Sequence, residues 1–225
     1  MKKRILLSWS SGKDSAWALH LLRGRDDLDI VALLTTVNES AGRVAMHAVR
    51  AELLHSQADC AGLPLWTVDL PWPCPNEEYE KRMRAVIARA HAAGIEAIAF
   101  GDLYLTDVRE YRERMLAGTG IAPLFPLWDM PTDALAREMI AGGLRAQITC
   151  IDTRVLPATL AGAEYNAEFL AALPAGTDPC GENGEFHSFA FAGPMFSQSV
   201  AISVGETWEC DGFLYTDLTP GYDGR

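Results

Sequence analysis

The sequence lacks the cysteine patterns that staple small secreted domains or bind zinc. Its five cysteines are an odd number, widely spaced, and form no C-x-x-C pair, so neither a disulfide framework nor a zinc site is indicated. They are Cys60, Cys74, Cys150, Cys180 and Cys210. We expect free and mostly buried thiols, as in proteins of a reducing compartment.

Long hydrophobic runs are absent as well. No stretch approaches the roughly 20 apolar residues of a membrane-spanning helix, so we expect no membrane span. The basic residues 1–4 are followed by an apolar run far too short for a signal peptide, so we expect a cytoplasmic protein. Hydrophobic residues make up 49% of the chain, which is ordinary for a globular protein and excludes a disordered or collagen-like one.

Positive charge is scarce. The chain has 19 Lys and Arg against 30 Asp and Glu, a formal net charge of −11. Proteins that bind nucleic acid usually rely on a basic face that displaces the counterions of the phosphates. We therefore expect nucleic acid not to be the main partner. The sequence favours no single oligomeric state, and a homodimer is one that it allows.

The first half of the chain alternates short apolar runs with helical patterns. Strands are predicted over residues 5–8, 30–36, 65–70 and 97–100, and helices over 15–22, 47–61 and 76–93. Asn76 is the predicted cap of the third helix, and Gly62 and Gly94 end the second and third. Strands that alternate with helices predict an α/β domain, a parallel sheet with helices on both faces, which we place at residues 1–125.

After residue 124 the regular alternation of strands and helices ends. Pro123, Pro126 and Pro131 predict a short linker. A helix over 132–141 and a strand over 146–151 follow, and then short strands over 186–191, 200–204 and 213–215. We predict a smaller α+β domain over residues 126–225, which we expect to hold an acceptor substrate.

The most informative segment is residues 8–15, Ser-Trp-Ser-Ser-Gly-Lys-Asp-Ser, between the first strand and the first helix. Open α/β sheets bind ligands at this edge, and the N–H groups of a Ser/Gly turn at a helix start bind anions. Lys13 adds a mobile positive charge for phosphate oxygens, and Asp14 beside phosphates indicates Mg²⁺. The Walker A and dinucleotide-binding patterns both fail here. A plain strand-to-helix turn capped by Ser15 is the alternative.

Segment 8–15 resembles the S-G-G-x-D-S signature of the PP-loop ATP pyrophosphatases, which have the N-type, adenine nucleotide α-hydrolase-like fold (HUP-type, Rossmann-like). Enzymes of that superfamily cleave ATP between the α and β phosphates, and the loop holds the leaving pyrophosphate. The sequence departs from the signature at one place, where Ser11 replaces the first glycine. Serine tolerates a positive φ less well than glycine.

Further segments resemble one PP-loop branch, the diphthine–ammonia ligase family. Residues 101–109 resemble its G-D-[IL]-x-x-x-x-x-R segment, and residues 124–128 its L-x-P-L-W segment. Residues 181–189 and 193–196 resemble its G-E-x-G-E-[FY]-x-[ST] and G-P-x-F signature. These segments span nearly the whole chain in the family's order. The family's architecture, a PP-loop domain followed by a smaller α+β domain, agrees with the boundary drawn above.

The resemblance implies an ATP-dependent amide-forming ligase that uses ATP and Mg²⁺. A substrate carboxylate, on a small molecule or a protein, attacks the α-phosphate, and ammonia or another amine then displaces AMP. The family's named reaction amidates diphthine on translation elongation factor 2. Two alternatives remain open: a non-catalytic sensor of adenine nucleotides, and a PP-loop enzyme that acts on tRNA.

The resemblance and the position of these residues at one sheet edge give a set of candidate site residues. Catalytic roles are expected for Lys13, Asp14, Asp102, Glu182 and Glu185, and Asp14 is the expected Mg²⁺ ligand. The expected ATP-binding residues are Ser8, Ser10, Ser11, Gly12, Lys13, Asp14, Ser15, Thr36, Met46 and Gly101.

Some candidates have an equally plain structural interpretation. Met46 either contacts the adenine base or is the first core residue of its helix. Asp102 either shares the Mg²⁺ or positions the amine, or it belongs to a helix-entry turn in which Asp107 caps the next helix. Glu182 and Glu185 either bind a cationic group, deprotonate ammonium or help hold Mg²⁺, or form a solvated hairpin tip.

Two arginines share this ambiguity. Arg109 and Arg112 lie near one face of the helix that follows Asp102. They either bind an acyl-phosphate or a substrate carboxylate, or form surface ion pairs with neighbouring glutamates.

Overall fold

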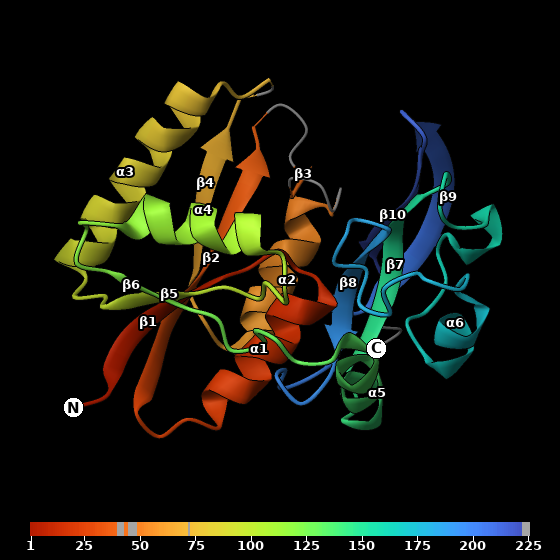
Figure 1. The fold of residues 1–225 in the computed structure, drawn as a ribbon, viewed down its shortest axis with the longest axis horizontal. Coiled ribbons are helices and arrows are strands. Elements are labelled where there is room, and N and C mark those ends of the chain that lie inside the picture. The colour runs from red at the N-terminus through yellow and green to blue at the C-terminus, as the bar shows by residue number, and fades with distance from the viewer. Residues whose placement is uncertain (40–42, 45–48, 72, 222–225) are drawn as a thin grey trace.

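A computed structural model of the chain describes residues 1–39, 43–44, 49–71 and 73–221. The elements form two parts that lie side by side (Figure 1). The first part is built on five parallel strands in the order β4-β2-β1-β5-β6, and β3 (Arg43–Val44) pairs antiparallel with the end of β2. The parallel strands are β1 (Lys3–Ser8), β2 (Leu28–Asn38), β4 (Leu65–Leu70), β5 (Ala97–Ala99) and β6 (Ala122–Leu124).

Helices cover both faces of this sheet. They are α1 (Lys13–Arg23), α2 (Ala51–Ala61), α3 (Asn76–Ala92) and α4 (Thr106–Leu116). The side chains of β1 alternate between two cores: Ile5 and Leu7 pack with α1 and α2, and Leu6 packs with α3 and α4. The predicted α/β class is confirmed.

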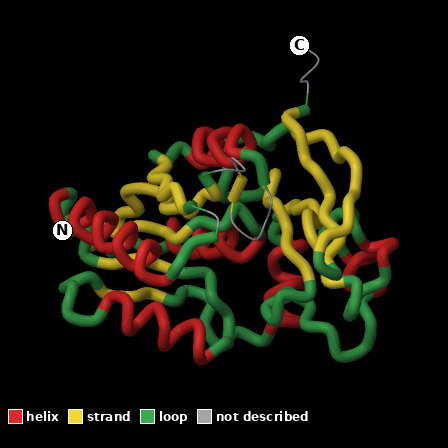
Figure 2. The backbone as a smooth tube through the Cα atoms, turned by 90° about the horizontal axis from the view of Figure 1, so that it is seen from above, coloured by secondary structure: helices red, strands yellow, loops and turns green. Residues whose placement is uncertain are grey.

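The second part holds an antiparallel sheet of order β8-β7-β10-β9, and Figure 2 shows its strands gathered at one end of the molecule. The strands are β7 (Arg145–Asp152), β8 (Phe186–Ala192), β9 (Ile202–Cys210) and β10 (Phe213–Pro220). The helices are α5 (Thr132–Ala141), α6 (Ala167–Ala172) and the single 3-10 turn η1 (Ala158–Leu160). The predicted smaller α+β domain is thereby confirmed as a fold.

Helices α1 and α2 lie between the two sheets (Figure 1). One continuous core joins β1, α1 and α2 to β7 and β8. Arg50 forms a bidentate ion pair with Asp217 across the boundary, with Nε–Oδ1 and Nη2–Oδ2 distances of 3.1 and 2.6 Å. Arg23, at the end of α1, donates from Nη1 to the carbonyl of Met195 at 2.6 Å. The second part is therefore packed against the first and not merely tethered to it.

Two of the helix caps considered above and one predicted helix start are wrong. Asn76 is the first residue of α3, and Pro75 holds the cap position, where its fixed φ of −63° suits a helix entry. Asp107 lies in the first turn of α4 and Leu105 is its cap residue. The helix expected over 47–61 begins at Ala51; residues 47 and 48 lie outside the described residues.

The predicted linker contains a strand. Pro123 lies in β6 opposite Ile98, and a proline is tolerated there because β6 is at the edge of the sheet. Strands β9 and β10 are longer than predicted and are joined by Asp211-Gly212, with φ values of 51° and 80°. Asp-Gly is a strong signal for a two-residue hairpin turn, so the sequence carried the information.

All five cysteines are free, and Cys60, Cys150 and Cys180 are buried, as expected. Within the described ranges, no helix has both the length and the apolar character needed to cross a bilayer.

Candidate active site

Two adjoining cavities open at the carboxyl ends of β1 and β5. The first, of about 290 Å³, lies between the strand ends and helices α3 and α4, and we call it the helical cavity. The second, of about 230 Å³, lies between the start of α1 and the loop before β8, and we call it the acidic cavity. Both are lined by Ser8, Ser10, Phe100, Arg112 and His187. They therefore form one continuous cleft.

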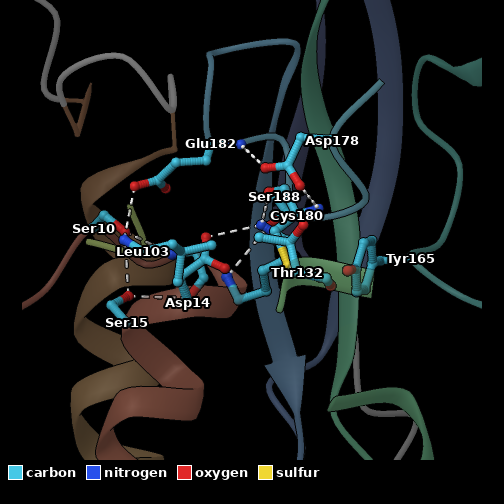
Figure 3. Close-up of polar contacts among 12 residues, drawn as sticks. Ser10, Asp14, Ser15, Leu103, Thr132, Tyr165, Asp178, Cys180, Glu182 and Ser188 are labelled. Carbon is cyan, nitrogen blue, oxygen red and sulfur yellow. Dashed lines mark hydrogen bonds and ion pairs between the residues drawn. The ribbon is translucent and has the colours of Figure 1, made fainter. Parts of the chain in front are cut away.

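Segment 8–15 lines this cleft with all of its residues except Ser11 and Gly12. Gly12 is the cap residue of α1, without a side-chain cap bond, so Ser15 is not the cap. The backbone N–H of Gly12 donates to Oγ of Ser10 at 3.3 Å, and Oγ of Ser15 donates to the carbonyl of Gly12 at 3.0 Å. The two hydroxyl oxygens lie 3.2 Å apart (Figure 3). The serines thus brace the turn from within.

Ser11 has a left-handed backbone, with φ at 68°. Its carbonyl accepts hydrogen bonds from the N–H of Ala190 and from Nε2 of Gln57, both at 2.9 Å. Its Oγ is buried, and no group in the described part of the chain bonds to it. The position therefore has the conformation for which the signature glycine is suited.

Gln57, fully buried on α2, clamps the segment to the second part. Its Oε1 accepts from Nε1 of Trp9 at 3.0 Å, and its Nε2 also donates to the carbonyl of Ala190 at 2.6 Å. Sequence reasoning missed this residue. The available signal was a lone amide on a helix face that otherwise carries Leu53, Leu54 and Ala58.

Lys13 is enclosed by the second part. Its Nζ lies 2.8 Å from Oδ2 of Asp14, donates to the carbonyl of Cys180, and sits 5.6 and 5.2 Å from the ring centres of Tyr165 and Phe186. Burial alone would lower the pKa of Lys13, but the Asp14 carboxylate and other negative groups outweigh it and raise the pKa. The ammonium stays charged and fixed, which differs from the mobile cation that we expected.

Asp14 keeps one carboxylate oxygen for another partner. Oδ1 is buried without a hydrogen bond to any described residue, and Asp14 lines the acidic cavity. Burial raises the pKa of Asp14, against the opposing effect of Lys13. The described residues contain no cluster of three metal-ligating side chains, so any Mg²⁺ here would depend on phosphate oxygens as well.

Gly101 and Asp102 follow β5 at the edge of the acidic cavity. A Cβ atom on Gly101 would lie 3.1 Å from the nitrogen of Ser15 and 3.2 Å from the carbonyl carbon of Asp14, so any side chain here would push the start of α1 away by a few tenths of an ångström. Oδ2 of Asp102 lies 3.4 Å from Nε of Arg112. Asp102 therefore holds an arginine.

Glu182 reaches across the acidic cavity toward the first part (Figure 3). Its Oε1 accepts the backbone N–H of Leu103 at 2.7 Å, and its own N–H donates to Oδ2 of Asp178 at 2.8 Å. Burial raises its pKa to about 7; the Leu103 hydrogen bond lowers it, and the negative charge of Asp14 raises it further. Asp178, which sequence reasoning missed, also accepts the N–H of Cys180 at 3.3 Å.

Glu185 lies beneath this loop and lines neither cavity. It is 7% exposed, and its Oε1 accepts from the N–H of Asp178 at 3.3 Å and from Nδ2 of Asn183 at 3.0 Å. The hairpin-tip interpretation is therefore wrong for Glu185, because the side chain is buried and bonded.

The remaining candidates divide between the cavities and their surroundings. Thr36 lines the helical cavity, and Met46 lies outside the described residues. Ser11 and Gly12 shape the segment but line neither cavity. The acidic cavity brings together Ser8, Ser10, Lys13, Asp14, Ser15, Gly101, Asp102 and Glu182.

The two arginines of α4 have different surroundings. Arg109 lines neither cavity: its guanidinium lies 4.9 Å from the ring centre of Phe125 and 4.6 Å from that of Trp128, and Nε pairs with Glu113 at 2.8 Å. Arg112 lines both cavities. Of the two expected alternatives, Arg109 fits ion pairing and Arg112 fits a place in the cleft.

Comparison with known proteins finds two family models that match this chain. A family model described as the diphthamide synthase N-terminal domain matches residues 1–123, and one described as the diphthamide synthase C-terminal domain matches residues 131–218. The proposed boundary at 125/126 falls between these regions and stays a prediction.

Three curated relatives share the name diphthine–ammonia ligase. The zebrafish (Danio rerio) protein is 26% identical over 167 residues, which cover 67% of this chain and 65% of the relative. The human (Homo sapiens) protein is 26% identical over 191 residues, 81% of this chain and 69% of the relative. The rat (Rattus norvegicus) protein is 27% identical over 141 residues, and the match spans only 52% of it.

Proposed function

Because the chain belongs to the diphthamide synthase family, we propose that it is an ATP-dependent ligase that forms an amide. A carboxylate oxygen of the acceptor attacks the α-phosphorus of ATP, the bond to the bridging β-oxygen breaks, and pyrophosphate leaves with that electron pair. The nitrogen of ammonia then attacks the acyl carbon of the acyl-adenylate and displaces AMP. Diphthine is the first acceptor to test, because the three relatives are named for it.

The continuous cleft at the ends of β1 and β5 is the observation that carries this proposal. Nucleotides bind in open α/β sheets at this edge, and small-molecule sites occupy about 300–1,000 Å³. The helical cavity, with its apolar lining from α3 and α4, suits the adenosine. The acidic cavity, at the start of α1, suits the phosphates, because the positive end of a helix dipole attracts anions.

Segment 8–15 would stabilise the charge that develops on the leaving pyrophosphate. Gln57 and β8 fix its backbone. The N–H groups of Gly12 and Lys13 donate to Oγ of Ser10 and Oγ of Ser188, and they would exchange these partners for phosphate oxygens. Backbone donors held around a developing charge are commonly worth about 3–4 kcal/mol each. The fixed charge of Lys13 lies behind the segment and favours anions in the cavity.

A magnesium ion fits this donor set. Mg²⁺ usually takes one or two carboxylates together with substrate phosphates, and Oδ1 of Asp14 is a buried carboxylate oxygen without a partner in the described chain. Asp14 would hold the ion, which would neutralise phosphate charge when bound.

Glu182 is suited to accept a proton from the incoming amine. A general base works best when its pKa lies near the working pH, and burial sets the pKa of Glu182 at about 7. It lines the acidic cavity together with segment 8–15, so the carboxylate lies beside the place proposed for the phosphates.

The test is a product assay by phosphorus NMR. The protein is incubated with ATP, Mg²⁺ and ammonium, with and without a diphthine-bearing protein or a small-molecule cell extract. AMP and pyrophosphate that require an acceptor support the proposal, and Asp14→Ala should abolish them while the exposed control Asp26→Ala does not. ADP and phosphate as products would contradict it. Tight ATP binding without any product would favour the nucleotide-sensor alternative.

A further inference from the structure

Two side chains with nitrogen donors flank the passage between the two cavities. Arg112 comes from α4 of the first part, and His187 comes from β8 of the second. Each lines both the helical and the acidic cavity. The other residues that line both are Ser8, Ser10 and Phe100, none of which carries a charge.

Arg112 is held in place from two sides. Its guanidinium carbon lies 5.0 Å from the ring centre of Phe100, and its Nε lies 3.4 Å from Oδ2 of Asp102. A guanidinium has four further N–H groups on its two terminal nitrogens, arranged as a fork that matches phosphate oxygens. Asp102 is therefore a positioning residue: it fixes the plane of the fork through Nε and leaves the terminal nitrogens to other partners.

His187 is fixed relative to segment 8–15 by its own strand. Ser188 accepts the backbone N–H of Lys13 at 3.2 Å, and Ala190 donates its N–H to the carbonyl of Ser11 at 2.9 Å. The strand that carries His187 is thus bonded to the segment on either side of Gly12. These bonds place the backbone of His187 at the passage, although the residue comes from the other part of the molecule.

We propose that Arg112 and His187 together hold the α-phosphate of the bound nucleotide. This inference rests on the proposed function, because it takes the adenosine to fill the helical cavity and the outer phosphates to fill the acidic one. The α-phosphate is the only group that joins these two portions, so it lies in the passage. The bond that breaks is the one from this phosphorus to the bridging oxygen.

The charges around the passage explain why donors to the α-phosphate are needed there. Asp14, Asp102 and Glu182 line the acidic cavity, and the ammonium of Lys13 is already paired with Asp14. Negative charge that builds up on the non-bridging α-oxygens during attack by a carboxylate therefore needs donors nearby. Arg112 supplies a fork of charged donors and His187 a ring N–H, the kind of positioned donors that stabilise phosphoryl-transfer transition states.

The test compares three ligands that differ only in phosphate: adenosine, AMP and ATP, titrated calorimetrically. Arg112→Met should weaken AMP and ATP binding by about tenfold or more, the effect of losing a charge-assisted pair, and leave adenosine within about twofold. His187→Ala should do the same to a smaller extent, and His187→Gln, which keeps an N–H donor, should recover part of the loss.

Matched controls separate this role from a general effect on the fold. Arg109→Met changes the same residue type on the same helix but outside both cavities, and His55→Gln changes an exposed histidine on α2. Neither should alter any of the three affinities. Arg112→Lys keeps the charge and removes the fork, so it tests the proposal if Arg112→Met does not fold.

The outcomes distinguish the two proposals. If AMP binding depends on Arg112 and His187 but no AMP and pyrophosphate are ever formed, the α-phosphate site stands and the ligase proposal fails. If turnover is observed while Arg112→Met and Arg112→Lys bind AMP as tightly as the wild type, or lose adenosine equally, the α-phosphate assignment is overturned.

Discussion

At the scale of single residues, several residues of the site have a backbone conformation or a buried environment that is energetically unfavourable for them. Ser11 takes a backbone conformation that costs an L-residue roughly 1–2 kcal/mol. Asp14 and Glu182 are carboxylates whose burial raises their pKa values. Such local costs are typical of functional sites, where the surrounding structure imposes them.

Ser11→Gly should stabilise the protein. Glycine removes the left-handed backbone penalty and a buried hydroxyl without a partner in the described chain. It also loses more conformational entropy on folding than serine does, which offsets part of this gain. The net increase in the free energy of unfolding should be about 0.5–1 kcal/mol. Urea unfolding measures the change. Ser11→Ala keeps the backbone penalty and removes only the hydroxyl, so it should gain less. A Gly variant that is less stable than wild type would show that the hydroxyl has a partner we have not identified.

Glu182→Gln should change the pH dependence of both activity and stability. In the unfolded chain this carboxyl loses its proton near 4.5, but in the folded protein burial raises its pKa to about 7. Between these pH values the folded state binds more protons, so the free energy of unfolding falls as pH rises from 4.5 to 7. Glutamine does not ionise, so the variant keeps the stability that wild type loses over this pH range. Because the Glu182 side chain is partly exposed, solvent screening reduces the effect, and the variant should be about 1 kcal/mol more stable than wild type above pH 7.

The activity of the same variant should lose its dependence on a group of pKa about 7, and its turnover should fall about 10²-fold or more, the usual effect of losing a general base. The exposed Glu206→Gln is the control and should change neither profile. An unchanged pH–rate profile in Glu182→Gln would remove Glu182 from the proton-transfer step.

At the scale of elements, the segment between β1 and α1 is shaped by elements far away in the chain. Strand β8 and helix α2 supply the groups that bond the carbonyl of Ser11. Helix α5 packs so closely against α1 that a Cβ on Gly142 would overlap the ring of Trp17. The position of the segment is therefore a property of the packing of α1, α2, α5 and β8.

Gln57→Met should loosen segment 8–15. The change leaves Nε1 of Trp9 and the carbonyl of Ala190 without their partner inside the core, at a cost of about 2–4 kcal/mol. Hydrogen exchange should speed up at the amides of segment 8–15 and of β8 before the global transition. Ser56→Ala, which removes only an exposed bond to the carbonyl of Glu52, should cost little. Unchanged exchange at the segment would show that the clamp is dispensable.

Gly142→Ala should destabilise the contact between α5 and α1. Its φ of −77° suits alanine, so the effect comes from overlap with the Trp17 ring and from a close contact of 3.1 Å with the carbonyl oxygen of Glu138. Overpacking of this kind costs about 1–3 kcal/mol. Urea unfolding followed by circular dichroism measures the change in the free energy of unfolding. Gly24→Ala, where the added Cβ meets only a carbonyl oxygen at 3.3 Å, is the matched control. A cost no larger than that of the control would contradict the close packing.

Sequence patterns predicted the elements whose ends carry their own signals. The strand over 65–70 and the helix over 132–141 have the predicted bounds, because Pro64 and Pro71 flank the strand and Pro131 and Gly142 flank the helix. Strand β6 was missed because Pro123 lies inside it, and only its place at the sheet edge makes that proline acceptable.

In the site, too, contacts that depend on tertiary packing could not be predicted from the sequence. Segment 8–15 was found from its Ser/Gly turn between a strand and a helix and from its resemblance to a known signature, and the glutamates before β8 from their place beside glycines in a second signature. The fixing of Lys13 by Tyr165 and Phe186 and the clamp of Gln57 were not found, because those partners are brought together only by tertiary packing. Glu185 has the same residue type as Glu182, and only the fold separates a buried support from a cavity residue.

At the scale of the whole molecule, the two sheets share the layer of α1 and α2. One core runs through this layer, and the Arg50–Asp217 ion pair closes its rim. Removing the second part would expose the apolar side of α1 and α2 that it covers.

We therefore expect calorimetry to show one unfolding transition, with equal calorimetric and van't Hoff enthalpies, as in a single cooperative unit. Arg50→Met should lower its midpoint slightly, since a half-exposed ion pair contributes about 1 kcal/mol or less, without splitting the peak. Two resolved transitions would show that the parts unfold independently.

The hydrogen bonds between Ser11, Gln57 and Ala190 limit how a protein with this fold can change during evolution. A domain that is joined by a linker alone can be exchanged for another by recombination. Here any replacement for the second part would have to present a strand with an N–H at the register of Ala190 and a carbonyl for the amide of Gln57, or the loop before α1 would lose its shape. New specificity is therefore more accessible through substitutions around the cleft than through exchange of the second part.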